Sequence, residues 1–397
     1  MLFGFLYSLE AKCNRSIERL ASLSHFPARL ALLCSLLVFL TGGDALVSIL
    51  VGYDKVAESA TWQFLAKQVT SPLTTFSDRE AYHHISKMTY RLFPAYLGKL
   101  CWGCSLKELM LFLVGLEYLA GFLFFYFSCQ LLRRYCADAV ALTWLLLGFC
   151  FVFLGKVFFW DTYAYFDAYA LLFLLLAMRS RHPAHIFLFL FLAFWTDERS
   201  VVASAWVWLW HALRPEPSDQ KPEFFQKPLL RPNKQQGAIG LALLVTLILR
   251  WLLANWYGLP PVAGLSQILT EAKFVLIQQR LIELLPFVTV SSFESYWLYI
   301  AGAVLTLWLH RERWGMVGFL LALGASLAVS FLVYDMTRSI MYAFPAIFIA
   351  VRILLLELPT AIFRRLAFCI FVAALLLPTY YLSHYMWPFF FRLLRFH

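Results

Sequence analysis

Four groups of ionisable residues interrupt or border the long apolar runs of this sequence. In chain order they are Asp44 with Asp54 and Glu58, Asp161 with Asp167, Asp197-Glu198-Arg199, and Asp335 with Arg338. A charge at bilayer depth costs about 2.5–3.5 kcal/mol on insertion scales, so each group needs a physical reason. Carboxylates can take a proton from a hydroxyl group, and arginines bind phosphate through paired hydrogen bonds. Together these residue types predict a site that holds a phosphate-bearing substrate and activates an acceptor hydroxyl.

A purely structural interpretation of the same groups stays open. Asp and Arg at helix ends also serve as caps and anchors, and Asp335 and Arg338 are spaced as a local ion pair. The combined set favours a site, because Asp197-Glu198-Arg199 is wedged between two apolar runs. Arg250 is the strongest single candidate, since a lone membrane arginine usually faces a carboxylate or an anionic ligand.

The composition predicts the elements that must position these residues. Of 397 residues, 62% are apolar and 14% are charged, whereas soluble domains average about 25% charged residues. A spanning helix needs roughly 20 apolar residues. Candidate runs lie at 30–51, 108–132, 137–155, 163–178, 184–196, 201–213, 238–257, 296–310, 314–334, 339–357 and 366–384. We therefore expect an all-α polytopic transmembrane bundle of about eleven spans, with 1–397 as a single integral membrane domain.

Two of these runs, 184–196 and 201–213, are too short to span comfortably, so they form either two tilted spans or a re-entrant pair. If every run spans and the N-terminus is cytoplasmic, the inside segments carry seventeen basic residues and the short outside segments carry seven. Because cytoplasmic loops are enriched in Lys and Arg, this orientation is the better one. All four ionisable groups then lie toward the outer face.

The predicted topology also assigns the non-spanning segments. Residues 52–107 form a first outer loop with interfacial helices, 214–236 form a cytoplasmic linker, and 258–295 form a second outer loop. The net charge of +10 is spread over short clusters between apolar runs, which disfavours nucleic acid as a partner.

Most of the eight cysteines fall in or beside apolar runs, which predicts small buried side chains rather than a disulfide framework. Cys101 and Cys104 have the spacing of a redox motif and would lie outside, where disulfides persist. Without a βαβ context around them, the sequence predicts no redox function for this pair.

Several of these segments resemble the GT-C superfamily of lipid-phosphosugar glycosyltransferases. Thr196-Asp197-Glu198-Arg199 is similar to the Thr-Lys/Arg-Glu segment of that superfamily, and the preceding basic turn, Arg179–Pro183, matches its short inner turn. The stretches from His83 to Arg91 and from Asp335 to Arg338 resemble segments of bacterial polytopic proteins of the same type. Two features depart from the pattern: Asp54 and Glu58 are four residues apart, and residue 197 is Asp where a basic residue is usual.

The resemblance implies a glycosyltransferase of the bacterial inner membrane that uses a polyprenyl-phosphate-linked sugar at the outer face in polysaccharide assembly. Asp54 is then the expected base, with Glu58 as its substitute, and a divalent cation is an open alternative as cofactor. The expected substrate-binding residues are Asp161, Asp197, Glu198, Arg199, Arg250, Asp335, Arg338, His83 and Arg91. The expected partners are the lipid-linked donor and membrane lipids.

A transporter or flippase and a glycan polymerase are the alternative functions. Transport is disfavoured because the charges gather at one face rather than at the midplane, and because the sequence shows no inverted repeat.

Overall fold

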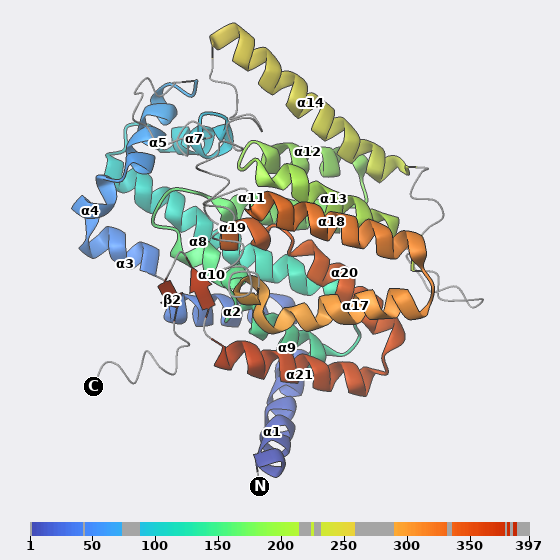
Figure 1. Ribbon diagram of the computed structural model, residues 1–397. Coiled ribbons are helices and arrows are strands. Elements are labelled where there is room, and N and C mark those ends of the chain that lie inside the picture. The colour runs from blue at the N-terminus through green and yellow to red at the C-terminus, as the bar shows by residue number, and fades with distance from the viewer. Residues whose placement is uncertain are drawn as a thin grey trace.

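A computed structural model of the chain describes residues 2–42, 44–73, 88–213, 224–225, 232–258, 290–331, 336–377, 379–381 and 384–386. These residues form an all-α bundle (Figure 1), with one short antiparallel pair of strands, β1 (Thr379–Tyr381) and β2 (His384–Met386), near the C-terminus. The helices are α1 (Leu2–Ser22), α2 (Phe26–Gly42), α3 (Asp44–Val51), α4 (Tyr53–Ala57), α5 (Ala60–Thr70), α7 (Leu92–Gly98), α8 (Leu106–Leu132), α9 (Ala139–Phe149), α10 (Phe153–Trp160), α11 (Asp167–Arg179), α12 (Pro183–Phe194), α13 (Arg199–Ala212), α14 (Lys234–Tyr257), α17 (Trp297–Leu309), α18 (Arg313–Phe331), α19 (Met336–Met341), α20 (Pro345–Glu357) and α21 (Thr360–Leu376).

Within the described ranges, three helices are long and apolar enough to cross a membrane: α8, α14 and α18. Two bent pairs, α2 with α3 and α9 with α10, raise the number to five if each pair is one span. These helices indicate a membrane protein. The remaining predicted runs correspond to shorter or interrupted helices, so the number of about eleven spans stays a prediction.

Two predicted runs differ in shape from what was expected. The run at 137–155 is not one straight helix, because α9 and α10 meet at a bend of 57°. The run at 366–384 is helical only to Leu376, and β1 and β2 follow. Close approach explains the bend: a Cβ atom added to Gly155 would lie 2.2 Å from the carbonyl oxygen of Phe149.

Helices α11 to α14 run back and forth between two ends of the bundle. We call the end that holds Asp167 and Arg199 the acidic end, and the end that holds Arg179 and Arg181 the basic end. Helix α11 begins at the acidic end and ends at the basic end, α12 returns, and α13 repeats the path of α11. Helix α14 starts at the basic end, where the Gln235 side chain donates to the Arg181 carbonyl (3.2 Å). It lies along α12 at one edge of the bundle (Figure 1).

The predicted first outer loop forms short helices that dock on the acidic end. Trp62 on α5 donates its indole N–H to the carbonyl of Thr162 (2.9 Å), and the Phe93 amide on α7 donates to the Trp195 carbonyl (3.0 Å). Because these bonds reach the segments before α11 and before α13, the loop is placed directly beside the charged groups of those segments.

A disulfide joins Cys101 to Cys104 in the turn that precedes α8. The three-residue spacing and the turn at Gly103 (φ +81°) bring this pair together, and it is the pair that the sequence set apart from the buried cysteines. Cys34, Cys129, Cys136 and Cys150 are free and buried, as the sequence predicts. A disulfide is typical of an oxidising compartment, and the outer placement of this loop stays a prediction.

Candidate functional site: a buried arginine–carboxylate network

The centre of the acidic end is Asp167, the first residue of α11. Its carboxylate accepts from Arg199 at the start of α13 (2.7 Å), from Arg338 on α19 (2.5 Å) and from the Tyr342 hydroxyl (2.8 Å). The side chains of the three charged residues are 2–7% exposed. A buried carboxylate in this position is tolerated because two guanidinium groups and a hydroxyl group compensate for its lost hydration.

Asp197 extends the network toward the first outer loop. It accepts hydrogen bonds from Nε (2.8 Å) and Nη2 (2.7 Å) of Arg199, and it also forms an ion pair with Arg91 at 2.9 Å. Arg91 in turn holds Glu198 with two parallel bonds, Nε to Oε2 (3.2 Å) and Nη2 to Oε1 (3.0 Å). The network therefore comprises three arginines and three carboxylates, drawn from four separate segments of the chain.

The local sequence explains why Asp197 and Arg199 face inward. After α12 ends, the Thr196 hydroxyl bonds back to the Leu192 carbonyl, and the Asp197 carboxylate accepts the backbone N–H of Arg199 (2.9 Å). This contact satisfies a free amide at the start of α13, as a capping side chain does. The chain therefore reverses direction within four residues while it keeps both charged side chains in the bundle interior.

Asp161 lies next to the network, but the hydrogen bonds that its carboxylate accepts come from the backbone. Its two oxygens accept the backbone N–H groups of Tyr163 (2.8 Å), Tyr165 (2.7 Å) and Phe166 (2.8 Å). The bonds hold a turn in which Ala164 and Phe166 have positive φ angles of 58°. Asp161 thus fixes the loop that leads into Asp167, and its oxygens are engaged by the backbone.

Arg250 on α14 is a further cation at this end. Its Nη2 donates to the Phe194 carbonyl (2.5 Å), and its guanidinium lies 5.5 Å from the Trp195 ring and 5.7 Å from the Tyr90 ring. Among the described residues, no carboxylate forms an ion pair with it. From the sequence, we expected Arg250 to face a carboxylate or an anionic ligand.

Three buried donors near Arg250 have no hydrogen-bond partner among the described residues. They are Nε of Arg250, Nη1 of Arg91 and Nε1 of Trp195. Buried donors in native proteins are nearly always satisfied, and the exceptions call for a water, an ion or a ligand. Because two of these three belong to arginines, an anion is the group that would satisfy them best.

The charges of the network hold Asp197 and Glu198 ionised. Burial alone would raise the pKa of Asp197, but Arg199 and Arg91 outweigh burial and lower that pKa below its usual range. Burial likewise raises the pKa of Glu198, while the charge of Arg91 and its hydrogen bond lower it, with a net decrease. Glu198 is also the most accessible carboxylate of the three, with 26% of its side chain exposed against 2% for Asp167 and 0% for Asp197.

The structure brings together five of the predicted site residues, namely Arg91, Asp197, Glu198, Arg199 and Arg338, and places Arg250 and Asp161 beside them. Asp54 and Glu58 are exposed on and just after α4, and neither forms an ion pair with any described residue. His83 and Asp335 lie outside the described residues.

The expected site residues did not include three members of this end of the bundle. Asp167 was noted only together with Asp161, and Tyr342 and the buried Glu117 of α8 were not identified. Glu117 interacts electrostatically with Asp161, Asp167 and Arg338. Glu117 could have been identified from the sequence as an acid in the middle of an apolar run. Tyr342 could have been identified by its position, one helical turn after Arg338.

Within the part of the chain that the structure describes, no group of three or more His, Cys, Asp or Glu side chains is arranged to hold a metal ion. In comparisons with known proteins, no family model, no curated protein and no solved structure matches this chain. The resemblance to the GT-C superfamily accordingly rests on the pattern of residues alone.

Proposed function

We propose that the acidic end is the donor and acceptor site of a membrane glycosyltransferase that uses a polyprenyl-phosphate-linked sugar. The observation that carries the proposal is the set of unsatisfied donors on Arg250, Arg91 and Trp195 beside an ionised carboxylate. A phosphate group satisfies several such donors at once, and the arginine charges stabilise it as it leaves the sugar.

The apolar face of α14 supports a lipid-linked donor. Leu244, Leu247 and Trp251 are large exposed apolar residues on the same helix as Arg250. A prenyl chain lying along this face from the bilayer would place its phosphate next to the arginine. A water-soluble donor would have no use for an apolar approach of this kind.

Glu198 is the carboxylate that we assign to the acceptor. In the proposed reaction the acceptor oxygen forms a bond to the sugar C1, and the bond between C1 and the phosphate oxygen breaks. The bonding electron pair leaves with the phosphate, and the acceptor proton passes to Glu198. We prefer Glu198 to Asp54 because Glu198 is partly accessible and lies beside the arginines, whereas Asp54 is exposed on α4.

Binding of a polyprenyl phosphate to the purified protein in neutral detergent tests the donor site, with native mass spectrometry as the readout. We expect Arg250→Gln to weaken binding at least tenfold and Arg250→Lys to weaken it less, because lysine keeps the charge but loses the paired geometry. Arg313→Gln, at an exposed arginine on α18, is the matched control and should bind as the parent does. Equal binding by Arg250→Gln and Arg313→Gln would contradict the donor site.

Transfer itself is tested in membranes supplied with a radiolabelled polyprenyl-phosphate sugar. Glu198→Gln should abolish incorporation of label into glycan at unchanged protein level, while Asp54→Asn should retain it. The reverse result would move the base to the position that the sequence first favoured. Substrate-dependent flux across proteoliposomes without transfer would favour a transporter instead.

A further inference from the structure

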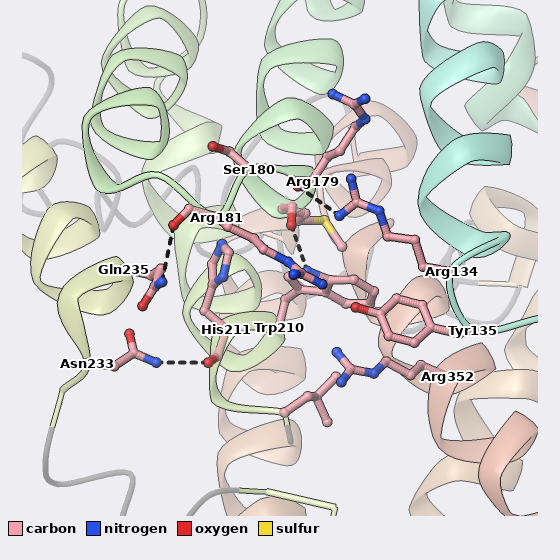
Figure 2. Close-up of a pocket in the computed structure, with 12 residues that line it drawn as sticks. Arg134, Tyr135, Arg179, Ser180, Arg181, Trp210, His211, Asn233, Gln235 and Arg352 are labelled. Atoms are coloured by element: carbon pink, nitrogen blue, oxygen red, sulfur yellow. Dashed lines mark hydrogen bonds between the residues drawn. The ribbon is translucent and has the colours of Figure 1, made fainter. Parts of the chain in front are cut away.

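The basic end of the bundle carries a cavity that the proposed transferase reaction does not use. The cavity has a volume of about 390 Å³, and it is lined by residues at the ends of α8, α11 and α13, at the start of α14, and on α20 (Figure 2). Its cations include Arg134, Arg181 and Arg352, which come from three separate elements. No acidic residue lines it.

The cavity is a built structure rather than a gap between loops. Gln235 donates to the Arg181 carbonyl (3.2 Å), Asn233 donates to the His211 carbonyl (3.0 Å), and Arg134 donates to the Arg179 carbonyl (3.2 Å). These bonds tie α14, α13, α8 and α11 together around the opening. Figure 2 shows His211, Asn233 and Gln235 on one side of the cavity, and Arg134, Tyr135 and Arg352 on the other.

Aromatic rings orient the most deeply placed cation. The Arg352 guanidinium lies 4.2 Å from the centroid of the Tyr135 ring and 5.2 Å from that of Trp210. Stacking of this kind holds a guanidinium in one orientation. The Trp210 indole is itself fixed by a bond to the Met178 carbonyl (2.7 Å).

Within the described ranges, no carboxylate forms an ion pair with Arg134, Arg179 or Arg181, so their positive charge is not neutralised there. This contrasts with the network of the acidic end, in which three arginines pair with three carboxylates. A concave site with several cations and no acid suits a ligand with more than one negative oxygen, since arginine binds phosphate in a paired geometry. Basic pockets between membrane helices are known binding places for anionic headgroups.

We propose that this cavity binds a phosphate group, in the form of an anionic phospholipid headgroup or a free diphosphate. The site lies roughly 20 Å from the acidic end, because α11 with 13 residues and α13 with 14 residues separate the two at 1.5 Å per residue. It is therefore a separate site, and its existence does not depend on the transferase proposal.

Two probes test the proposal on the purified full chain in neutral detergent: a short-chain phosphatidylglycerol and inorganic pyrophosphate, each titrated by calorimetry. The double variant Arg134→Gln/Arg181→Gln removes two exposed cations of the lining without disturbing a buried group. The matched control is Arg133→Gln, next to Arg134 but stacked on Phe26 outside the cavity.

We expect at least one probe to bind, the double variant to lose affinity at least tenfold, and Arg133→Gln to bind as the parent does. Binding of the phosphatidylglycerol alone identifies a lipid headgroup, and binding of pyrophosphate with similar affinity identifies a free phosphate ligand. Absence of binding by both probes, or an equal loss in the control, would overturn the proposal.

Discussion

Asp167 is the carboxylate that pairs with both Arg199 of α13 and Arg338 of α19. It forms an ion pair with Arg338, and it shares Arg199 with Asp197. Removing one partner of a buried ion pair is costly, because the remaining charge stays in a region of low polarity.

Asp167→Asn should therefore lower the stability of the folded protein by roughly 3–5 kcal/mol, as measured by the thermal unfolding midpoint in detergent. Asp54→Asn makes the same chemical change at an exposed position and should alter stability by no more than about 0.5 kcal/mol. Similar midpoints for the two variants would show that the Asp167 ion pairs contribute nothing net.

Asp197 and Glu198 give the fold a dependence on pH whose sign can be worked out. Their pKa values in the folded protein lie below the usual values, so the unfolded chain binds more protons in acid. Their contribution is fully present above the unfolded pKa values of about 3.9 and 4.3, and it is lost as the pH falls through the folded values.

Between neutral pH and about pH 5, Asp197 and Glu198 should contribute little change to the thermal unfolding midpoint. As the pH is lowered below about 5, protonation of these two carboxylates should lower the midpoint. The fall should be smaller in Arg91→Gln, because Arg91 lowers both pKa values. A midpoint that rises on acidification would mean that burial, rather than the arginines, dominates the pKa of these carboxylates.

The sequence could indicate which residues belong to the acidic end, but not how they pair. Charged groups in apolar runs stand out by their cost, which is why Asp197, Arg199 and Arg338 were found. Pairing depends on how helices pack, and Asp167 and Arg338 are separated by 171 positions. Asp161 and Asp167 look equivalent in the sequence, and only the backbone turn at 163–166 assigns the first to the loop and the second to the network.

Among the helices, the broken pair α9 and α10 shows what an apolar pattern cannot predict. A continuous apolar run indicates a helix, yet it carries no information on a bend of 57°. Gly155 is the residue that makes the bend possible, because any side chain there would meet the Phe149 backbone. The bend in turn sets the direction of α10, which leads into Asp161.

Gly155→Ala should destabilise the protein by about 1–3 kcal/mol, since backbone atoms must move to admit the methyl group. Gly115→Ala is the control, because Gly115 is exposed within α8 and an added Cβ there meets no atom within 4 Å. There, alanine should be neutral or slightly stabilising, as it usually is in a helix. If both variants unfolded at the same temperature, the close contact at Gly155 would not control the bend.

For the molecule as a whole, carboxylates lie beside the arginines at the acidic end, whereas no acidic residue lines the cavity at the basic end. The predicted orientation assigns the two ends to opposite faces of the membrane. Arg134, Arg179 and Arg181 contribute to the seventeen inside charges, and the structure gathers them around one cavity. The sequence analysis used these residues only to infer topology. Their convergence on one cavity, together with Arg352 from α20, required the packing of five elements.

Fusion reporters test the orientation. A reporter after Arg214 should be cytoplasmic and a reporter after Gly258 periplasmic, because α14 lies between the two points and is long enough to cross the bilayer. Reversed locations at both points would reject the predicted orientation. The same location at both points would show that α14 does not cross.

Asp167 and Arg338 are in contact in the fold but far apart in the sequence, so they are synthesised at different times. Ribosomes add about 5–20 residues per second, so Arg338 is synthesised roughly 10–30 s after Asp167. During that interval the Asp167 carboxylate lacks one of its two guanidinium partners. The network can close only when α19 has emerged. Chains truncated before residue 338 should therefore be recognised and degraded by membrane quality control, whereas chains truncated after α21 should persist.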